Sequence, residues 1–222
     1  MDNVANKEFY LYKDIQMRTG GEIYMGVIGP VRTGKSTLIK RIMDLLVIPN
    51  LPENAEKTRI LDELPQSGSG RTITNTEPKF LPKEAFELNL SEDVRLKIRL
   101  IDCVGYMIKG AAGHMEDEQP RMVKTPWSED KIPFVKAAEI GTRKVMQDHS
   151  TIGIVVTCDV SFSDLPRENY IEAEMSTVTE MKKLGKPFVV VLNSIRPYGD
   201  DVGMLAKELE SQYQVPVLPK DE

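Results

Sequence analysis

Eight consecutive residues carry the clearest chemical pattern in the sequence. The run Gly29-Pro30-Val31-Arg32-Thr33-Gly34-Lys35-Ser36 has the full spacing G-x-x-x-x-G-K-[ST]. The two glycines let the backbone turn tightly and point its N–H groups inward, which makes an anion-binding concavity at a helix N-terminus. The lysine brings a positive charge to the β- and γ-phosphates, and the serine hydroxyl is a ligand for Mg²⁺. The run, together with the adjacent Thr37, therefore predicts a binding site for a nucleoside triphosphate.

The segments around this loop have the form that such a site requires. The apolar run over 22–29 predicts a buried strand that ends in glycine. The following residues, 34–47, place apolar side chains at the spacing of an amphipathic helix. Because a strand precedes the loop and a helix follows it, a chance match to the motif is a poor explanation.

A second Mg²⁺ anchor is expected at the end of a neighbouring strand. Asp102 follows the apolar run KIRLI and is followed by Gly105, which gives the pattern D-x-x-G. We expect Ser36 and Asp102 to share the metal ion, and the Gly105 backbone N–H to meet the γ-phosphate. The irregular residues 103–133 are then a candidate second switch that senses hydrolysis.

A first switch is expected between the helix and the next strand, and it should carry a threonine that ligates Mg²⁺. The stretch GRTITNTEPKF contains Thr72, Thr74 and Thr76. Thr76 is the preferred metal ligand and catalytic residue because it lies nearest the following strand. The order of phosphate loop, threonine, hairpin and D-x-x-G resembles the translation-factor-related class of GTPases.

The segment VVVLNSIRP at 189–197 departs from those GTPases, which carry N-K-x-D at this place. Asn193 is retained and predicted to bind the nucleotide, but Ser194 replaces the lysine and Arg196 replaces the aspartate. An arginine has only donors, so it cannot accept hydrogen bonds from guanine. Unpaired buried donors cost about 1–3 kcal/mol each, which favours ATP over GTP as the substrate. The alternative is that the segment is displaced and another part of the chain contacts the base.

The residues expected to support hydrolysis also differ from the GTPase pattern. Tyr106 follows D-x-x-G where Ras-like enzymes have a water-orienting glutamine, so turnover is expected to be slow or to depend on assembly. Cation-dependent relatives carry asparagine at the position of Arg32. We therefore hypothesise that the Arg32 guanidinium replaces a monovalent cation near the phosphates and is catalytic. A surface ion pair of Arg32 is the alternative, and Arg71 is a second candidate for the same charge.

Apolar runs and helical periodicities alternate along the chain and predict an α/β, three-layer, mostly parallel fold with one antiparallel edge strand. Residues 1–20 are expected to be an N-terminal extension, and 21–219 a single P-loop domain. The expected elements are strands at 22–29, 151–159, 186–193 and 215–218, a hairpin over 85–102 that turns at 91–93, helices at 34–47, 134–149, 167–184 and 201–213, and irregular regions at 47–80, with a short helix near 53–64, and 103–133.

Composition limits the classes of partner. The 222 residues carry a net charge of −5 with both signs interspersed, which gives no reason to expect nucleic acid. No run approaches the roughly 18 apolar residues of a membrane span, and the N-terminus lacks a signal-peptide core. Cys103 and Cys158 lie in apolar runs and are expected to be reduced core residues, and two histidines are too few for a metal cage. A cytosolic location is expected.

Six stretches closely resemble the stage IV sporulation protein A family of endospore-forming bacteria, with a match from about residue 8 to 219. They are RTGGEIYMGVIGPVRTGKST, DELPQSGSGRTITNTEPKF, IRLIDCVGY, PRMVKTPW, AAEIGTRKVMQDHSTIG and KPFVVVLNSIRPY. The resemblance implies an ATPase of GTPase-like ancestry whose hydrolysis drives polymerisation into the basal layer of the spore coat. It also implies a place at the outer forespore membrane, on the mother-cell side, and a small amphipathic membrane-associated peptide as partner.

By motif, the resemblance makes Lys35 the phosphate-loop lysine, Asp102 the Walker B-type acid and Thr76 the sensor threonine. Full-length members are about twice this length, so contacts with the peptide and other coat proteins are expected through regions outside this chain. Two rival functions stay open. A P-loop phosphotransferase would need an acceptor pocket with a general base, for which no segment offers a clear candidate. A GTP-dependent regulatory switch would need the missing guanine-binding aspartate.

Overall fold

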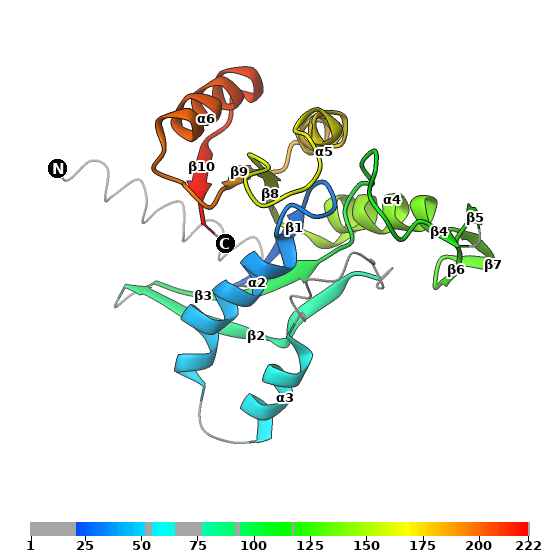
Figure 1. Ribbon diagram of the computed structural model, residues 1–222. Helices are drawn as coiled ribbons and strands as arrows, with labels where there is room; N and C mark the ends of the chain where they lie inside the picture. The colour runs from blue at the N-terminus through cyan, green and yellow to red at the C-terminus, as the bar shows by residue number, and fades with distance from the viewer. Residues whose placement is uncertain (1–20, 52–54, 65–76, 92–93, 117, 222) are drawn as a thin grey trace.

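One six-stranded sheet forms the centre of the molecule. The computed structural model describes residues 21–51, 55–64, 77–91, 94–116 and 118–221 (Figure 1). The strands lie in the order β10-β9-β8-β1-β3-β2, and every neighbouring pair is parallel except β2 and β3. Their bounds are β1 Glu22–Ile28, β2 Lys79–Ser91, β3 Val94–Asp102, β8 Ile152–Cys158, β9 Phe188–Asn193 and β10 Val217–Lys220. The mostly parallel sheet with an antiparallel edge strand is the predicted architecture.

Helices cover both faces of this sheet. Two of them end in a π-helical turn, α2 over Met43–Val47 and α4 over Val145–His149. A 3₁₀ turn over Ile48–Asn50 follows the first of these turns. The helix bounds are α2 Lys35–Ile42, α3 Ala55–Glu63, α4 Phe134–Lys144, α5 Glu168–Leu184 and α6 Asp200–Tyr213. Each helix agrees with a predicted one, although helix α2 leaves α-helical geometry earlier than its apolar periodicity indicated.

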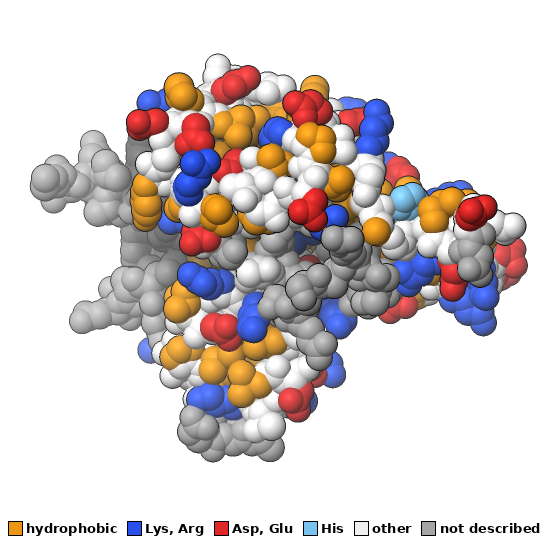
Figure 2. Space-filling model, viewed as in Figure 1, with side chains coloured by type: hydrophobic (Ala, Val, Ile, Leu, Met, Phe, Trp, Pro, Cys, Tyr) orange, Lys and Arg blue, Asp and Glu red, His pale blue; other side chains and the backbone are white. Residues whose placement is uncertain are grey.

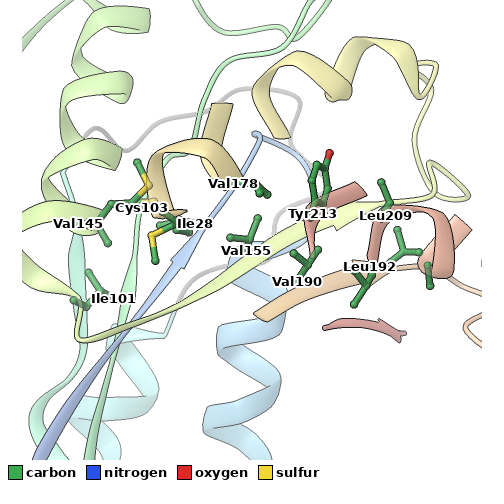
Figure 3. Close-up of a cluster of buried hydrophobic side chains, with 14 of the residues drawn as sticks. Ile28, Ile101, Cys103, Val145, Val155, Val178, Val190, Leu192, Leu209 and Tyr213 are labelled. Carbon is green, nitrogen blue, oxygen red and sulfur yellow. The ribbon is translucent and has the colours of Figure 1, made fainter. Parts of the chain in front are cut away.

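Adjacent residues of the strands supply two separate hydrophobic clusters, because side chains alternate between the faces of a strand. Val27 packs in one cluster with residues of α2 and α3, whereas its neighbour Ile28 packs in the other with residues of α4, α5 and α6. Leu100 and Ile101 of β3 divide in the same way. Figure 3 shows residues of the second cluster, which come from strands and helices far apart in the sequence. The sheet is therefore the middle layer of three.

The central position of β1 places the predicted motifs together. Strand β1 pairs with β3 on one side and with β8 on the other. In the first pairing Val27 is opposite Asp102, so the residue that ends β3 lies beside the end of β1 and the start of the phosphate loop. The carboxyl ends of parallel strands, next to the point where the strand order reverses, are where α/β sheets bind ligands.

Two predictions of local structure were wrong. Residues 103–133, expected to be irregular, contain two small hairpins, β4 Met115–Glu116 with β5 Gln119–Pro120 and β6 Met122–Thr125 with β7 Ser128–Pro133. They lie at the end of α4 that is distant from the sheet (Figure 1). Strand β2 begins at Lys79 and not at residue 85, because its pairing with β3 shifts register between Leu81 and Phe86 and interrupts the alternating pattern.

The surface and the cysteines agree with an ordinary globular domain. Acidic and basic side chains are mixed over the visible face (Figure 2). Both cysteines are free thiols and buried, and burial raises the pKa of each to about 11. Among the described residues, no helix combines the length and apolar character that crossing a membrane requires.

Candidate functional site

The loop between β1 and α2 has the backbone form of a phosphate cradle. Gly29 has φ 134° and Gly34 has φ 95°, conformations that side chains rarely adopt. A Cβ at Gly29 would lie 2.3 Å from the Val156 carbonyl oxygen, and a Cβ at Gly34 would lie 2.2 Å from the Asn193 amide nitrogen. Both positions thus require glycine. The loop ends at the N-terminus of α2, where free N–H groups and the helix dipole favour an anion.

The Lys35 side chain lies inside this loop. It is 5% exposed, and its ammonium donates to the carbonyl oxygen of Pro30 at 2.5 Å and to that of Gly29 at 3.4 Å. Burial lowers the pKa of Lys35, and the nearby Cys103 and Asp102 oppose that shift. The buried ammonium is held by neutral carbonyl oxygens. A phosphate at the loop would supply the opposite charge that this ammonium lacks.

Ser36 and Asp102 meet where the metal ion was predicted. The Ser36 hydroxyl donates to Asp102 Oδ2 at 3.0 Å, while Asp102 Oδ1 is buried without a hydrogen-bond partner among the described residues. Burial raises the pKa of Asp102, opposed by the Lys35 charge and the Ser36 hydrogen bond. A hydroxyl and a carboxylate with a free oxygen are the hard ligands that Mg²⁺ prefers, so these residues fit the predicted ion.

The residues after Asp102 are bonded directly to the phosphate loop. Tyr106 N–H donates to the Gly29 carbonyl at 3.1 Å, and Val31 N–H donates to the Tyr106 carbonyl at 2.9 Å. A Cβ at Gly105 would lie 2.2 Å from the Gly29 carbonyl oxygen and 2.6 Å from Lys35 Nζ, so Gly105 sits against the ammonium. Gly105, whose N–H is predicted to contact the γ-phosphate, therefore lies next to Lys35.

Asn193 joins the end of β9 to the phosphate loop. Its amide donates to the Thr33 carbonyl at 3.1 Å, and the buried Thr33 hydroxyl donates to the Pro30 carbonyl at 3.0 Å. Asn193 thus stabilises the conformation of the phosphate loop. Sequence reasoning assigned it to nucleotide binding, a role that stays a prediction.

The two residues that replace the guanine-binding pair are engaged within the protein. Ser194 N–H donates to the Lys220 carbonyl at 2.8 Å, and the Ser194 hydroxyl accepts from the Arg196 N–H at 3.0 Å. The Arg196 guanidinium forms an exposed ion pair with Asp201 at 3.0 Å. This pair occupies both the arginine and the nearby carboxylate at the start of α6.

Arg32 stands at a strained position of the loop. Its φ of 62° lies in the left-handed region, and no hydrogen bond or ion pair holds its side chain within the described part of the chain. The surface ion pair weighed as an alternative is thus not seen there. Thr37 lies partly buried in the first turn of α2, while Arg71, Thr72, Thr74 and Thr76 fall outside the described residues.

Two residues at the site were missed by sequence reasoning. Thr142 of α4 accepts a hydrogen bond from the Gly105 N–H at 3.1 Å, and Glu180 of α5 accepts one from the Tyr106 hydroxyl at 2.5 Å. The Tyr106 phenol, considered as a poor substitute for a water-orienting glutamine, is therefore bonded to a carboxylate. Neither residue belongs to a motif, so only the packing of α4 and α5 reveals them.

The fold and the loop together define a P-loop nucleoside triphosphatase domain. Residues 6–222 match the family model described as stage IV sporulation protein A, ATPase domain. The chain therefore belongs to the stage IV sporulation protein A family and covers its ATPase domain, as the resemblance in sequence indicated.

Curated relatives agree with this assignment. The chain is 52% identical over 208 residues to stage IV sporulation protein A of Bacillus anthracis and of Bacillus subtilis (strain 168), and 53% identical over 209 residues to that of Clostridioides difficile (strain 630). Each alignment covers 94% of this chain but 42% or 43% of the relative, so the chain spans less than half their length. Two solved structures of SsGBP mutation variants align over 99% and 98% of this chain and 57% and 56% of their own, with TM-scores of 0.49 and 0.46 at 16% identity.

Proposed function

We propose that this domain binds ATP with Mg²⁺ and hydrolyses it slowly to ADP and phosphate. The convergence of Lys35, the Ser36–Asp102 pair and Gly105 on one buried loop supports this proposal above any other observation. Each of these groups is charged, polar or sterically fixed, and none is needed to build the core. Together they provide the positioning and the electrostatic stabilisation that phosphoryl transfer requires.

The residues divide the work in a simple way. The loop N–H groups and Lys35 bind the β- and γ-phosphates and balance the charge that develops on them. Ser36 and Asp102 would hold Mg²⁺, which would neutralise phosphate charge when bound. Gly105 donates its N–H to the γ-phosphate, and Thr76 is proposed as the sensor of the same group. Slow turnover is expected because the Tyr106 phenol, which the structure shows bonded to Glu180, is a poor substitute for a water-orienting glutamine.

Adenine is the proposed base. Arg196 has no acceptor for guanine, and its partner Asp201, a carboxylate in the first turn of α6, is already paired with that arginine. Breaking an exposed pair of this kind costs little, about 1 kcal/mol or less. The ion pair alone therefore does not exclude guanine. The preference for ATP depends on the contacts that the base makes once the Arg196–Asp201 pair opens, and a direct comparison of ATP with GTP tests it.

For the whole protein we propose the role that the family name and the resemblance support. ATP hydrolysis by this domain would commit a spore coat scaffold to self-assembly around the forespore, from the mother-cell cytoplasm. A small amphipathic membrane-associated peptide and other coat proteins are the proposed partners, through parts of the relatives that this chain does not span. A GTP-timed switch and a small-molecule phosphotransferase are the competing functions.

Phosphate release tests the proposal. The purified chain is incubated with Mg²⁺ and either ATP or GTP, beside Lys35→Ala and the matched surface variant Lys40→Ala. We expect slow release from ATP, at least tenfold less from GTP, loss in Lys35→Ala and normal release in Lys40→Ala. Equal or preferred use of GTP would restore the switch hypothesis. Release that requires an added phosphoryl acceptor would favour the phosphotransferase.

A further inference from the structure

The N–H group of Gly105 already has a partner in the structure. It donates to Thr142 Oγ1 at 3.1 Å. Thr142 is fully buried in the last turn of α4. The threonine oxygen is thus held in place as an acceptor for the group that the proposed function directs to the γ-phosphate.

The next residue is tethered on the other side. The Tyr106 hydroxyl donates to Glu180 Oε2 at 2.5 Å, and Glu180 Oε1 accepts from Arg143 Nε at 2.9 Å. Gly105 is therefore held by α4, and Tyr106 is held by α5. Glu180 and Arg143 also line a pocket along α5, so this tether reaches the protein surface.

We propose that Thr142 is a positioning residue that withholds the Gly105 N–H from a nucleotide lacking a γ-phosphate. This inference rests on the proposed function. ADP leaves the Thr142–Gly105 hydrogen bond intact, whereas ATP takes the N–H for its γ-phosphate and breaks that bond. Breaking the Thr142–Gly105 hydrogen bond lowers the affinity for ATP, and in exchange the ATP-bound and ADP-bound states differ in conformation. A ligand shifts a conformational equilibrium only through contacts that differ between the states, and here that contact is the Gly105 N–H.

The Thr142→Val variant isolates this effect. Valine keeps the branched shape but removes the acceptor, so the buried Gly105 N–H is unpaired in the nucleotide-free and ADP-bound states alone. Those states lose stability relative to the ATP-bound state. We expect the ratio Kd(ADP)/Kd(ATP analogue) to rise about three- to tenfold, measured with Mg²⁺ and a non-hydrolysable ATP analogue.

Two further variants sharpen the test. Thr142→Ser keeps the hydroxyl and should restore the wild-type ratio. Tyr106 directly follows Gly105, so the inference requires its bond to Glu180 to break as well when Gly105 turns to the γ-phosphate, and Tyr106→Phe, which removes that bond from a partly exposed ring, should raise the ratio in the same direction. If Thr142→Val does not fold, as judged by circular dichroism, Tyr106→Phe carries the test.

The outcomes separate this inference from the proposed function. Lys35-dependent nucleotide binding with an unchanged ratio in Thr142→Val, or in Tyr106→Phe where that variant carries the test, overturns the inference alone. An equal shift in Thr142→Ser and Thr142→Val also overturns it, because packing and not the hydroxyl would then be responsible. Absence of any Lys35-dependent binding by the wild-type chain overturns both.

Discussion

At the scale of single residues, the site buries charged groups without giving them partners of opposite charge in hydrogen-bond contact. Lys35 is buried against neutral carbonyl oxygens, and Asp102 buries an oxygen that has no partner among the described residues. Burial lowers the pKa of the lysine and raises that of the aspartate, so each group is destabilised in its charged form. Such groups are what a phosphate and a metal ion would relieve, and stability is often traded for function in this way.

The Asp102→Asn variant should separate stability from activity. Removing the buried charge is expected to raise the free energy of unfolding of the nucleotide-free chain by about 1 kcal/mol. The same change should abolish stabilisation by ATP with Mg²⁺, since the metal loses its carboxylate. Chemical denaturation with and without nucleotide measures both effects. The exposed Asp62→Asn is the control, and a destabilised nucleotide-free Asp102→Asn would contradict this account.

The Arg32→Ala variant tests whether the guanidinium replaces a monovalent cation. We expect hydrolysis to fall by about 10-fold or more, as for loss of one charge-stabilising group, and to recover partly with added potassium. Phosphate release at several potassium concentrations measures this, with the exposed Arg41→Ala of α2 as the matched control. Unchanged hydrolysis without potassium dependence would refute the hypothesis.

At the scale of elements, a buried carboxylate ties α5 to its neighbours. Glu174 is fully buried, and it accepts from Thr157 of β8, pairs with Arg167 at 2.6 Å and accepts from the Tyr213 hydroxyl of α6 at 2.5 Å. Three segments distant in sequence thus meet at one side chain. A satisfied buried charge of this kind is costly to disturb by removing one partner.

The Tyr213→Phe variant tests this junction. Removing one donor from the buried Glu174 is expected to lower the free energy of unfolding by about 1–3 kcal/mol. Tyr198, which is 98% exposed, provides the control, because Tyr198→Phe should change stability by less than about 0.5 kcal/mol. Urea unfolding of the two variants measures the difference. Equal midpoints would show that the phenol contributes nothing to the network.

The elements also show what the sequence can and cannot predict. The strand, loop and helix around Lys35 were predictable because their signals are local and periodic. The hairpins β4–β7 were missed because their strands are short and mostly exposed, so no alternation of apolar residues marks them. Thr142 and Glu180 were missed for another reason, since nothing local distinguishes a helix residue that will contact a loop more than 35 positions earlier.

At the scale of the whole molecule, the buried Lys35 predicts a dependence on pH. Its pKa is lowered, so the folded protein loses this proton at a lower pH than the unfolded chain does. Between those two pKa values the unfolded state binds more protons, so the Lys35 contribution to unfolding free energy rises with pH. Below both pKa values both states are protonated, and the cost of burying the charge is fully present.

Activity should fall over the pH range in which the Lys35 contribution to the free energy of unfolding rises. Because phosphate binding needs the ammonium, kcat/KM for ATP is expected to fall on the alkaline side below the ordinary lysine pKa. A pH profile of phosphate release measures this limb. The Lys35→Arg variant cannot titrate in that range, so whatever activity it retains should lack the limb. An identical limb in both proteins would assign it to another group.

The β6–β7 hairpin gives the chain an optical property. Trp127 is the sole tryptophan, and it lies in the turn between these strands. Arg121 joins the hairpin to the start of α4 by two contacts. Its carbonyl oxygen accepts from the Phe134 N–H at 2.7 Å, and its guanidinium lies 4.9 Å from the centre of the Phe134 ring. All indole emission therefore arises at one end of α4, while Thr142 lies two turns further along the same helix. A change in intrinsic fluorescence would therefore report movement transmitted along α4 to the hairpin. Changes confined to the phosphate loop would leave the emission unaltered.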